Sequence, residues 1–347
     1  DWKHNDYDIV YSHLPEHTGQ LKNLLFNTTD ICPTIIGYTH WTEFKEITNY
    51  EYEVGLAFNI IGLLQMDKCG INTQAQKELV LKNAKEHFND DVIKQLDKIL
   101  EPHYLGWETP EYEQQTTDKN IIVYNHRPHT YKNYPWFLEQ MDKLYEERQD
   151  FEVWVPLADK KEKDYMTIDK YDRFGYFSKL SSCKVGVCCK QKYEGWAVSA
   201  TDGMSVGVPY MFSDDGSYHE LADEAGIYYK GSDDFLKLMN KALDDKEFRN
   251  EYSEKSLQRF KDSKWEKQIQ RINDTFNTAI SNFRPIKETE SYNKIVEFIR
   301  TKKSVTKNEI LLHMGWGVRI GFTTYRNRLR NEKDIKFTKN RYEVINK

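Results

Sequence analysis

The sequence predicts an α/β protein with two doubly wound domains in tandem, a cleft between them, and a small third domain at the C-terminal end. Short β-rich apolar runs alternate with helix-period segments up to about residue 284, as in βα repeats that feed a parallel sheet. A polar, proline-bearing connector at Glu108–Lys119 divides the alternation into two series. A change in charge sets the last 60 or so residues apart. Ligands of open parallel sheets bind at the carboxyl ends of the strands, so a ligand is expected in the cleft.

Length and composition exclude several classes of protein. The chain has 347 residues, 39% hydrophobic and 30% charged, and no apolar run of about 18 residues that could span a membrane. No signal peptide opens the sequence. The five cysteines lack zinc-ligand spacing, which indicates reduced thiols and a cytoplasmic location. Because the chain opens at Asp1 on a strand-like run, we expect a short leader, including a first strand and its loop, to precede it.

The first series defines an N-terminal acceptor-side domain, residues 1–118. Strands are predicted at Ile9–His13 and Thr34–His40 with a helix between them, followed by Gly55–Gln65 and an amphipathic helix at Thr73–Phe88. His13 and His40 both end strands, at the edge that would face the cleft. Each could hydrogen-bond a ligand there, although a lone histidine at a strand end is more often structural.

The second series defines residues 119–284. Its predicted strands are "NIIVYNH", "FEVWVPL", "SCKVGVCC", "PYMF" and "GIYY", and helices are expected at Trp136–Arg148, Val198–Val206, Phe235–Leu243 and Glu247–Ile280. "RFGYF" is a further short element. "SNFRPIKETES" reads as a linker to the third unit, residues 285–347.

Charge is divided unevenly along the chain. Residues 286–347 hold 15 Lys and Arg against 7 Asp and Glu, a net charge of +8, whereas the remainder holds 35 against 48, or −13. Such asymmetry indicates a tail with an anionic partner. A solvated basic surface is the alternative.

A loop after the strand "NIIVY" carries the first group of candidate residues. Arg127 and Lys132 stand five positions apart, just before a helix whose free N–H groups would face the same space. A guanidinium, an ammonium and a helix N-terminus together suit a diphosphate. On its own, the loop is as readily explained as a solvated loop with incidental basic residues.

The stretch "YEGWAVSATDGMSVGVP" carries the second group. Glu194 sits at a loop–helix junction, Gly195 would let the backbone approach a ligand, and Asp202 follows two helical turns later. Carboxylates in these places can accept hydrogen bonds from sugar hydroxyls. An acid favoured by the helix dipole and an ordinary surface Asp are the alternative explanation.

Taken together, the two groups resemble the donor-binding domain of retaining GT-B glycosyltransferases of the family 4 kind. The likeness covers residues 120–280 well and residues 1–118 only loosely. It implies two Rossmann-like domains, Arg127 and Lys132 on the donor diphosphate, and Glu194 and Asp202 at the positions of an E-x7-E motif that contacts the sugar and the ribose. "SVGVP" matches the "A.G.P" that follows this motif, Glu220 matches a later acidic position, and "RFGYFSKLSSCKVGV", with Phe174, resembles the segment near the nucleobase.

The resemblance has departures and further implications. Asp202 is one methylene shorter than the usual Glu, and "EGW" replaces "EGFG", which puts Trp196 near the sugar beside Gly195 and Ala197. "NHR" replaces "GR". In "YTHW", His40 resembles the family's strand-end "HD" loop, so we rank it above His13, Glu43 and Glu16 for a catalytic role with Glu194, Arg127 and Lys132. Enzymes of this kind need no metal or resident cofactor, the nucleotide sugar being a co-substrate.

The last unit resembles a winged helix-turn-helix. Helices are expected from "YNKIVEFIRTKK", from "TKNEILLHMGW", which opens with a Thr306–Glu309 capping box, and from "GFTTYRNRLRNEKDI"; "IKFTKNRYEVI" predicts a hairpin. The resemblance implies double-stranded DNA as partner. The expected DNA-binding residues are Arg319, Arg326, Arg328, Arg330, Lys339 and Arg341. A basic helical cap on an enzyme is the alternative.

A GT-B domain pair joined to a DNA-binding unit resembles phage enzymes that glycosylate hydroxymethylated pyrimidines, in the cytoplasm of an infected cell. The resemblance implies transfer of a hexose, glucose from UDP-glucose, to duplex DNA with retention of configuration. Two alternatives stay open: a glycosyltransferase acting on a polysaccharide or lipid, and a non-catalytic DNA-binding protein on a GT-B scaffold. Sugar, nucleotide, acceptor base and oligomeric state are not determined by the sequence.

Overall fold

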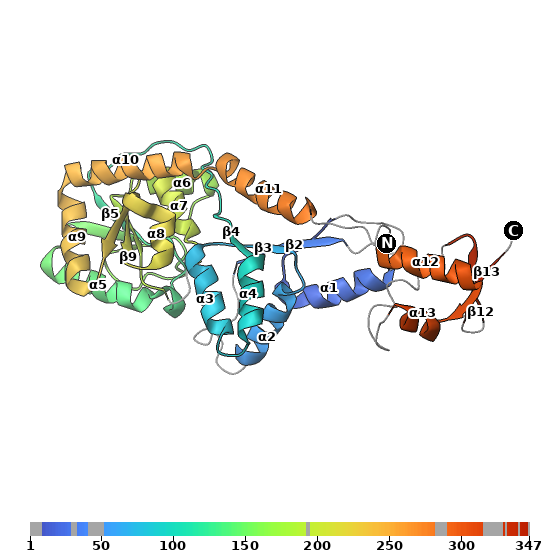
Figure 1. Ribbon diagram of the computed structural model, residues 1–347. Helices are drawn as coiled ribbons and strands as arrows, with labels where there is room; N and C mark the ends of the chain where they lie inside the picture. The colour runs from blue at the N-terminus through green and yellow to red at the C-terminus, as the bar shows by residue number, and fades with distance from the viewer. Residues whose placement is uncertain are drawn as a thin grey trace.

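Three separate β-sheets organise the part of the chain that the structure describes (Figure 1). The computed structural model describes residues 9–28, 33–40, 52–191, 195–281, 290–314, 329, 332–338 and 341–345. Within these residues no helix is both long and apolar enough to cross a membrane. The first two sheets are parallel, as the alternating pattern predicts, and the third is small and antiparallel.

The first sheet has four parallel strands in the order β1-β2-β3-β4. The strands are β1 (Ile9–Ser12), β2 (Thr34–Thr39), β3 (Lys68–Ile71) and β4 (Leu100–Pro102), and the helices are α1 (Pro15–Thr28), α2 (Tyr52–Leu63), α3 (Gln74–Ala84) and α4 (Asp90–Ile99). The sequence predicts β1 and β2 but not β3 and β4, because "KCGI" and "LEP" each contain a charged residue and a glycine or proline, which are depleted in strands. Thr73 caps α3 by accepting a hydrogen bond from the Gln76 backbone.

The second sheet has six parallel strands in the order β10-β9-β8-β5-β6-β7. They are β5 (Asn120–Val123), β6 (Phe151–Trp154), β7 (Met166–Thr167), β8 (Val185–Cys188), β9 (Tyr210–Ser213) and β10 (Gly226–Tyr229). The chain reverses its direction of winding between β5 and β8, which are neighbours in the sheet. In doubly wound folds this reversal opens a crevice at the carboxyl ends of the two strands.

Two layers of helices cover the second sheet and pack into separate hydrophobic clusters. One layer consists of α5 (Tyr134–Glu147) and α9 (Ser232–Asp244); the other consists of α6 (Arg173–Ser181), α7 (Val198–Ser205) and α8 (Gly216–Ala222). Single 3₁₀ turns, η1 (Thr130–Lys132) and η2 (Asp223–Ala225), precede α5 and β10. Loops at the carboxyl edge therefore face either the α5/α9 layer or the α6/α7/α8 layer.

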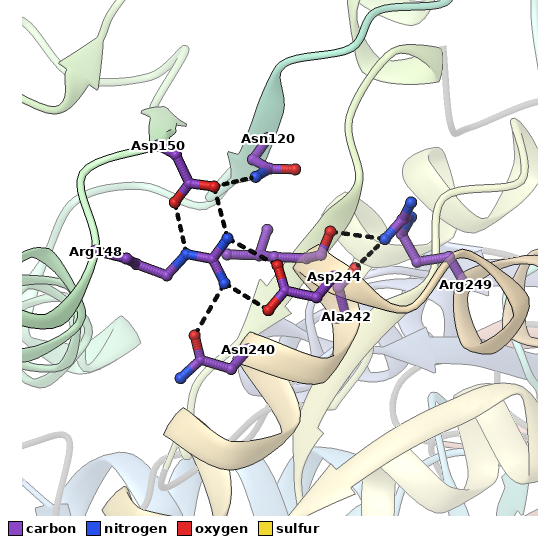
Figure 2. Close-up of polar contacts among 8 residues, drawn as sticks. Asn120, Arg148, Asp150, Asn240, Ala242, Asp244 and Arg249 are labelled. Carbon is purple, nitrogen blue, oxygen red and sulfur yellow. Dashed lines mark hydrogen bonds and ion pairs between the residues drawn. The ribbon is translucent and has the colours of Figure 1, made fainter.

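An arginine clamp fixes the opposite, amino-terminal edge of this sheet (Figure 2). Arg148, at the end of α5, donates to Asp150 before β6 at 2.6 Å and to Asp244 at the end of α9 at 2.8 Å. The guanidinium lowers the pKa of Asp150. Bidentate arginine–carboxylate pairs are geometrically specific, so the clamp sets the spacing of α5 and α9 far from the candidate site.

The C-terminal helices of the second unit return to the first sheet. The stretch expected as one helix, Glu247–Ile280, is two: α10 (Lys246–Asp262) and α11 (Trp265–Ser281). Helix α11 packs against β2 and β3, where the Thr275 hydroxyl lies 2.9 Å from His103 Nε2. The two α/β units are therefore joined both by the connector and by α11.

The third sheet confirms two features expected of the last unit. Strands β12 (Ile335–Thr338) and β13 (Arg341–Val344) form an antiparallel hairpin, and β11 (Ser304–Thr306) adds to β13. Helix α12 (Glu290–Lys302) comes first in this unit. Helix α13 (Lys307–His313) opens with the expected Thr306–Glu309 capping box. Most of the expected third helix, at residues 321–335, lies outside the described residues, so the winged-helix assignment stays a prediction.

Candidate functional site

The neighbouring strands β5 and β8 bring two predicted site loops to the same edge of the second sheet. Val123 pairs with Gly186, so the segments that follow these strands start side by side. The first segment carries Arg127 and Lys132, and the second carries Gly195, Trp196 and Ala197. Glu194, the firmest candidate from the sequence, lies outside the described residues.

Two contacts hold the Arg127–Lys132 loop, one buried and one partly buried. His126 Nε2 lies 3.0 Å from the Cys188 thiol at the end of β8, and burial lowers the pKa of His126 to about 3, so the ring is neutral. The Tyr124 hydroxyl donates to the Lys132 carbonyl at 2.9 Å. Arg127 is exposed, and the Lys132 ammonium lies 5.3 Å from the Tyr131 ring centre. The loop backbone is thus fixed while the Arg127 guanidinium faces solvent.

Asn125 is buried and its side chain makes three hydrogen bonds to neighbouring elements, a role that the sequence did not indicate. Its Nδ2 donates to the Tyr176 hydroxyl at 2.8 Å and to the Ser199 carbonyl at 2.7 Å, and its Oδ1 accepts from the Tyr210 hydroxyl at 3.0 Å. Both amide hydrogens and the oxygen are used, as a buried amide requires. Asn125 therefore ties the end of β5 to α6, α7 and β9. Its position directly after a predicted apolar strand is the only signal that the sequence offered.

Asp202 belongs to the same hydrogen-bond network, through Tyr176. The Tyr176 hydroxyl lies 3.3 Å from Asp202 Oδ2, and burial raises the pKa of Asp202 to about 6, opposed by Tyr176 and by Arg173. The carboxyl group therefore titrates near neutral pH, in the range useful for proton transfer. The ribose contact implied by the family resemblance stays a prediction.

The Gly195–Ala197 segment contacts the first domain. A Cβ on Gly195 would lie 2.7 Å from both Asn72 Nδ2 and Gln76 Oε1. We expected Gly195 to let the backbone approach a ligand, but the space of its missing side chain is taken by these two amides. Trp196 is only 8% exposed and stacks on Tyr104, with ring centres 5.7 Å apart. Its indole is therefore part of the domain interface instead of an open pocket wall.

The same two amides hold His40. Asn72 Nδ2 and Gln76 Nε2 donate to the His40 carbonyl at 3.0 and 2.6 Å. The exposed ring of His40 lies 5.6 Å from that of His13. Partial burial lowers the pKa of His40, which a hydrogen bond with Asn72 opposes and His13 reinforces. The structure thus brings His40 and the Gly195 segment together from different domains.

Glu220 links the second domain to the first by hydrogen bonds. Its carboxylate accepts from the backbone N–H groups of Gln74 and Ala75, both at 2.7 Å, and from the Tyr104 hydroxyl at 3.0 Å. These are the first two residues of α3, where the helix dipole favours an anion. Sequence reasoning placed Glu220 only by family resemblance. Its role here is to join α8 to α3 across the domain boundary.

The remaining candidates are Phe174 and the predicted DNA-binding residues, of which only Phe174 and Arg341 lie within the described residues. Phe174, in the first turn of α6, is 51% exposed, and its contact with a nucleobase stays a prediction. Arg341, the one predicted DNA-binding residue within the described part, instead donates to the Ser304 carbonyl at 3.1 Å and lies 3.6 Å from Glu309. Five predicted DNA-binding residues lie outside the described residues: Arg319, Arg326, Arg328, Arg330 and Lys339. Across the described ranges, no three His, Cys, Asp or Glu side chains gather as a metal site.

Comparison with known proteins supports the architecture. No protein-family description and no curated protein matches the sequence. Solved structures do match. S. aureus TarM is 13% identical with a TM-score of 0.61, and the match covers 78% of this chain and 54% of TarM. Sucrose-phosphate synthase from Thermosynechococcus elongatus is 12% identical with a TM-score of 0.60 (79% of this chain, 74% of the synthase), and Anabaena HepE with UDP and glucose is 10% identical with a TM-score of 0.62 (78% of each chain). The chain spans about half the length of TarM. The protein has the fold of the GT-B glycosyltransferases.

Proposed function

We propose that the protein is a sugar-nucleotide-dependent hexosyltransferase that acts on DNA. The reaction would transfer glucose from UDP-glucose to the hydroxyl of a hydroxymethylated pyrimidine base, with retention at the anomeric carbon. The observation that supports the donor half is the pairing of β5 with β8, from which the Arg127–Lys132 loop and the segment leading to Gly195 both start. Gly195 lies against Gln76, which also donates to the His40 carbonyl.

The donor diphosphate would bind at Arg127 and Lys132. Cleavage of the bond between the anomeric carbon and the diphosphate leaves negative charge on the phosphate oxygen. A guanidinium and an ammonium on a rigid loop stabilise that charge as it develops, without reorganising at the moment of reaction. HepE was solved with UDP and glucose in the same fold, which supports a uridine nucleotide as the donor.

The acceptor side would be formed by the first domain. His40, whose lowered pKa favours the neutral ring, would orient the acceptor hydroxyl or the sugar. Glu194 would position the sugar, and Asp202 the ribose. Because a base hydroxyl inside a duplex cannot reach this edge, the target base would leave the stack.

The basic C-terminal segment supports a nucleic acid as the acceptor. Residues 286–347 carry a net charge of +8, on a chain that is otherwise acidic. Arg341 would contribute to folding of the segment instead of to binding, since its guanidinium is engaged by Ser304 and Glu309. Lysines and arginines that neutralise phosphates release counterions, so binding would weaken steeply with salt.

One assay tests the proposal. The protein is incubated with labelled UDP-glucose and with duplexes that carry hydroxymethylcytosine, hydroxymethyluracil or no modification. Label that enters only a modified duplex supports the proposal. UDP release with no label in DNA contradicts the DNA acceptor and leaves a polysaccharide or lipid acceptor. DNA binding with no UDP release indicates a non-catalytic DNA-binding protein.

A further inference from the structure

A cavity of about 420 Å³ at the carboxyl edge of the second sheet is not used by the site described above. Its wall comes from the start of α5 and from the segments that follow β8, β9 and β10, and includes Asn133, Trp136, Lys190, Asp215 and Lys230. Asn133 and Trp136 belong to the α5/α9 layer, and Asp215 precedes α8 of the other layer. None of the lining residues takes part in the hydrogen bonds that join Asn125, Tyr176 and Asp202. The volume is within the range of about 300–1,000 Å³ that is usual for small-molecule sites.

Two residues of the cavity wall occupy helix N-cap positions without capping. Asn133 precedes α5 in the left-handed conformation, with φ of 55°, and makes no side-chain cap bond. Asp215 precedes α8 and makes none either; its carboxylate accepts from the Ser213 hydroxyl at 2.8 Å. Neither side chain caps its helix, and both line the same cavity.

The charges of the cavity wall are balanced. The Lys190 ammonium lies 3.9 Å from the Asp215 carboxylate, and the Lys230 ammonium lies 3.2 Å from the Asp214 carboxylate. A phosphate would be repelled by the two aspartates, and a cation would be repelled by the two lysines, so neither kind of charged ligand is favoured. A neutral polyhydroxyl ligand suits both signs, because each hydroxyl can donate to a carboxylate and accept from an ammonium.

Trp136 adds an aromatic wall. Its ring stacks on Tyr229 with an interplanar angle of 5° and ring centres 5.7 Å apart, which fixes the plane of the indole. The negative face of an aromatic ring attracts the weakly positive C–H groups on one side of a pyranose. A flat aromatic surface beside carboxylate, amide and ammonium groups is the combination that binds sugars.

We propose that this cavity is a binding site for a neutral pyranose sugar, separate from the donor diphosphate site. Asn133 and Asp215 hydrogen-bond the hydroxyls, Lys190 and Lys230 donate to them, and Trp136 packs on the ring. The proposal does not rest on the identity of the donor or of the acceptor.

The test is binding of free D-glucose, D-galactose and N-acetylglucosamine to the full chain by saturation-transfer difference NMR. Wild-type protein is expected to bind at least one of the three. Asn133→Gly keeps the left-handed backbone, and Asp215→Asn keeps the shape of the side chain. Each is expected to weaken sugar binding about fivefold, the loss of one hydrogen bond. Asp233→Asn, on the exposed first turn of α9 and outside the cavity wall, is the matched control and is expected to bind as wild type.

A second arm separates this site from the donor site. Saturating UDP is expected to leave the sugar bound, and Arg127→Ala is expected to weaken UDP binding but not sugar binding. Three results would overturn the proposal: no signal for any of the three sugars, unchanged affinity in both cavity variants, or loss of the sugar signal in Arg127→Ala or on addition of UDP. Thermal melts confirm that each variant is folded.

Discussion

The side-chain amide of Gln76 donates a 2.6 Å hydrogen bond to the carbonyl oxygen of His40. The same side chain presents its Oε1, which has no hydrogen-bond partner among the described residues, 2.7 Å from where a Cβ of Gly195 would stand. One residue of α3 therefore touches the strand-end segment of the first domain and the loop of the second. This contact brings together two segments that are more than 150 residues apart in sequence.

Gly195→Ala should disrupt the contact between Gly195 and the side chains of Asn72 and Gln76. The added methyl would lie 2.7 Å from Asn72 Nδ2 and Gln76 Oε1, closer than real Cβ contacts, so these two side-chain amides must move away from the His40 carbonyl that they hold. We expect loss of glycosyl transfer of at least tenfold, because small displacements in a site are costly, together with a lower melting temperature. Gly19→Ala, on α1 with its nearest neighbour at 4.0 Å, should stabilise slightly. Wild-type transfer rates in Gly195→Ala would contradict the assigned packing.

Asp202 should make stability depend on pH. Its folded-state pKa is about 6, against 3.8 in a free side chain. Between about pH 4 and 6 the folded protein keeps a proton that the unfolded chain has released, so stability falls as pH rises through this window. Asp202→Asn should remove that fall and raise the free energy of unfolding at pH 7 by about 1–3 kcal/mol.

Urea unfolding at pH 4.5 and pH 7 measures this effect. Asp172→Asn, a change at the exposed cap of α6 where Asn caps as well as Asp, is the control and should leave the pH dependence intact. An Asp202→Asn protein no more stable than wild type at pH 7 would contradict the raised pKa. A fall in glycosyl transfer in this more stable variant would show that the carboxylate is retained for function.

Glu220→Ala should loosen the contact between the domains. It removes an anion from the first two N–H groups of α3 and the acceptor of the Tyr104 hydroxyl. We expect a loss of about 1–2 kcal/mol in unfolding free energy, seen as a lower melting temperature. Glu224→Ala, four residues further and exposed, should stay within about 0.5 kcal/mol of wild type. Equal effects of the two changes would argue against the role of Glu220.

Arg127→Ala and Lys132→Ala should each lower kcat/KM by about 10²–10³-fold, the typical cost of removing a group that stabilises transition-state charge. The melting temperature should hardly change in Arg127→Ala, since that side chain is exposed. Release of UDP measures the rate, and Lys161→Ala in an exposed loop is the control. Rates that match those of the control would exclude this loop from the donor site.

Truncation after Phe283 should weaken DNA binding and flatten its dependence on salt while leaving UDP binding intact. Arg341→Ala in the full chain should leave DNA affinity within twofold, because the guanidinium is held by Ser304 and Glu309, and should lower the melting temperature of the C-terminal unit. Fluorescence anisotropy at several salt concentrations measures both. DNA affinity that survives the truncation would remove the basis for a DNA-binding C-terminal unit.

Strand and helix positions were predictable where local patterns were strong. The apolar runs of β5, β8 and β9 are fully buried, and such continuous runs are typical of parallel strands covered on both faces. The strands β3 and β4 were missed because "KCGI" and "LEP" interrupt the apolar pattern with a charged residue and a glycine or proline. The break between α10 and α11 was also missed, because the helical periodicity continues through it.

The sequence by itself determined the α/β class, the hairpin, the capping box and the loop that carries Arg127 and Lys132, since each depends on residues close together in the chain. Only the tertiary structure decided that Trp196 is covered by Tyr104, that Asp202 joins Tyr176, and that Gly195 and His40 share Gln76. These contacts join residues from different elements or different domains. Local propensity carries no information about them, because they are fixed only when the sheets and helices pack together.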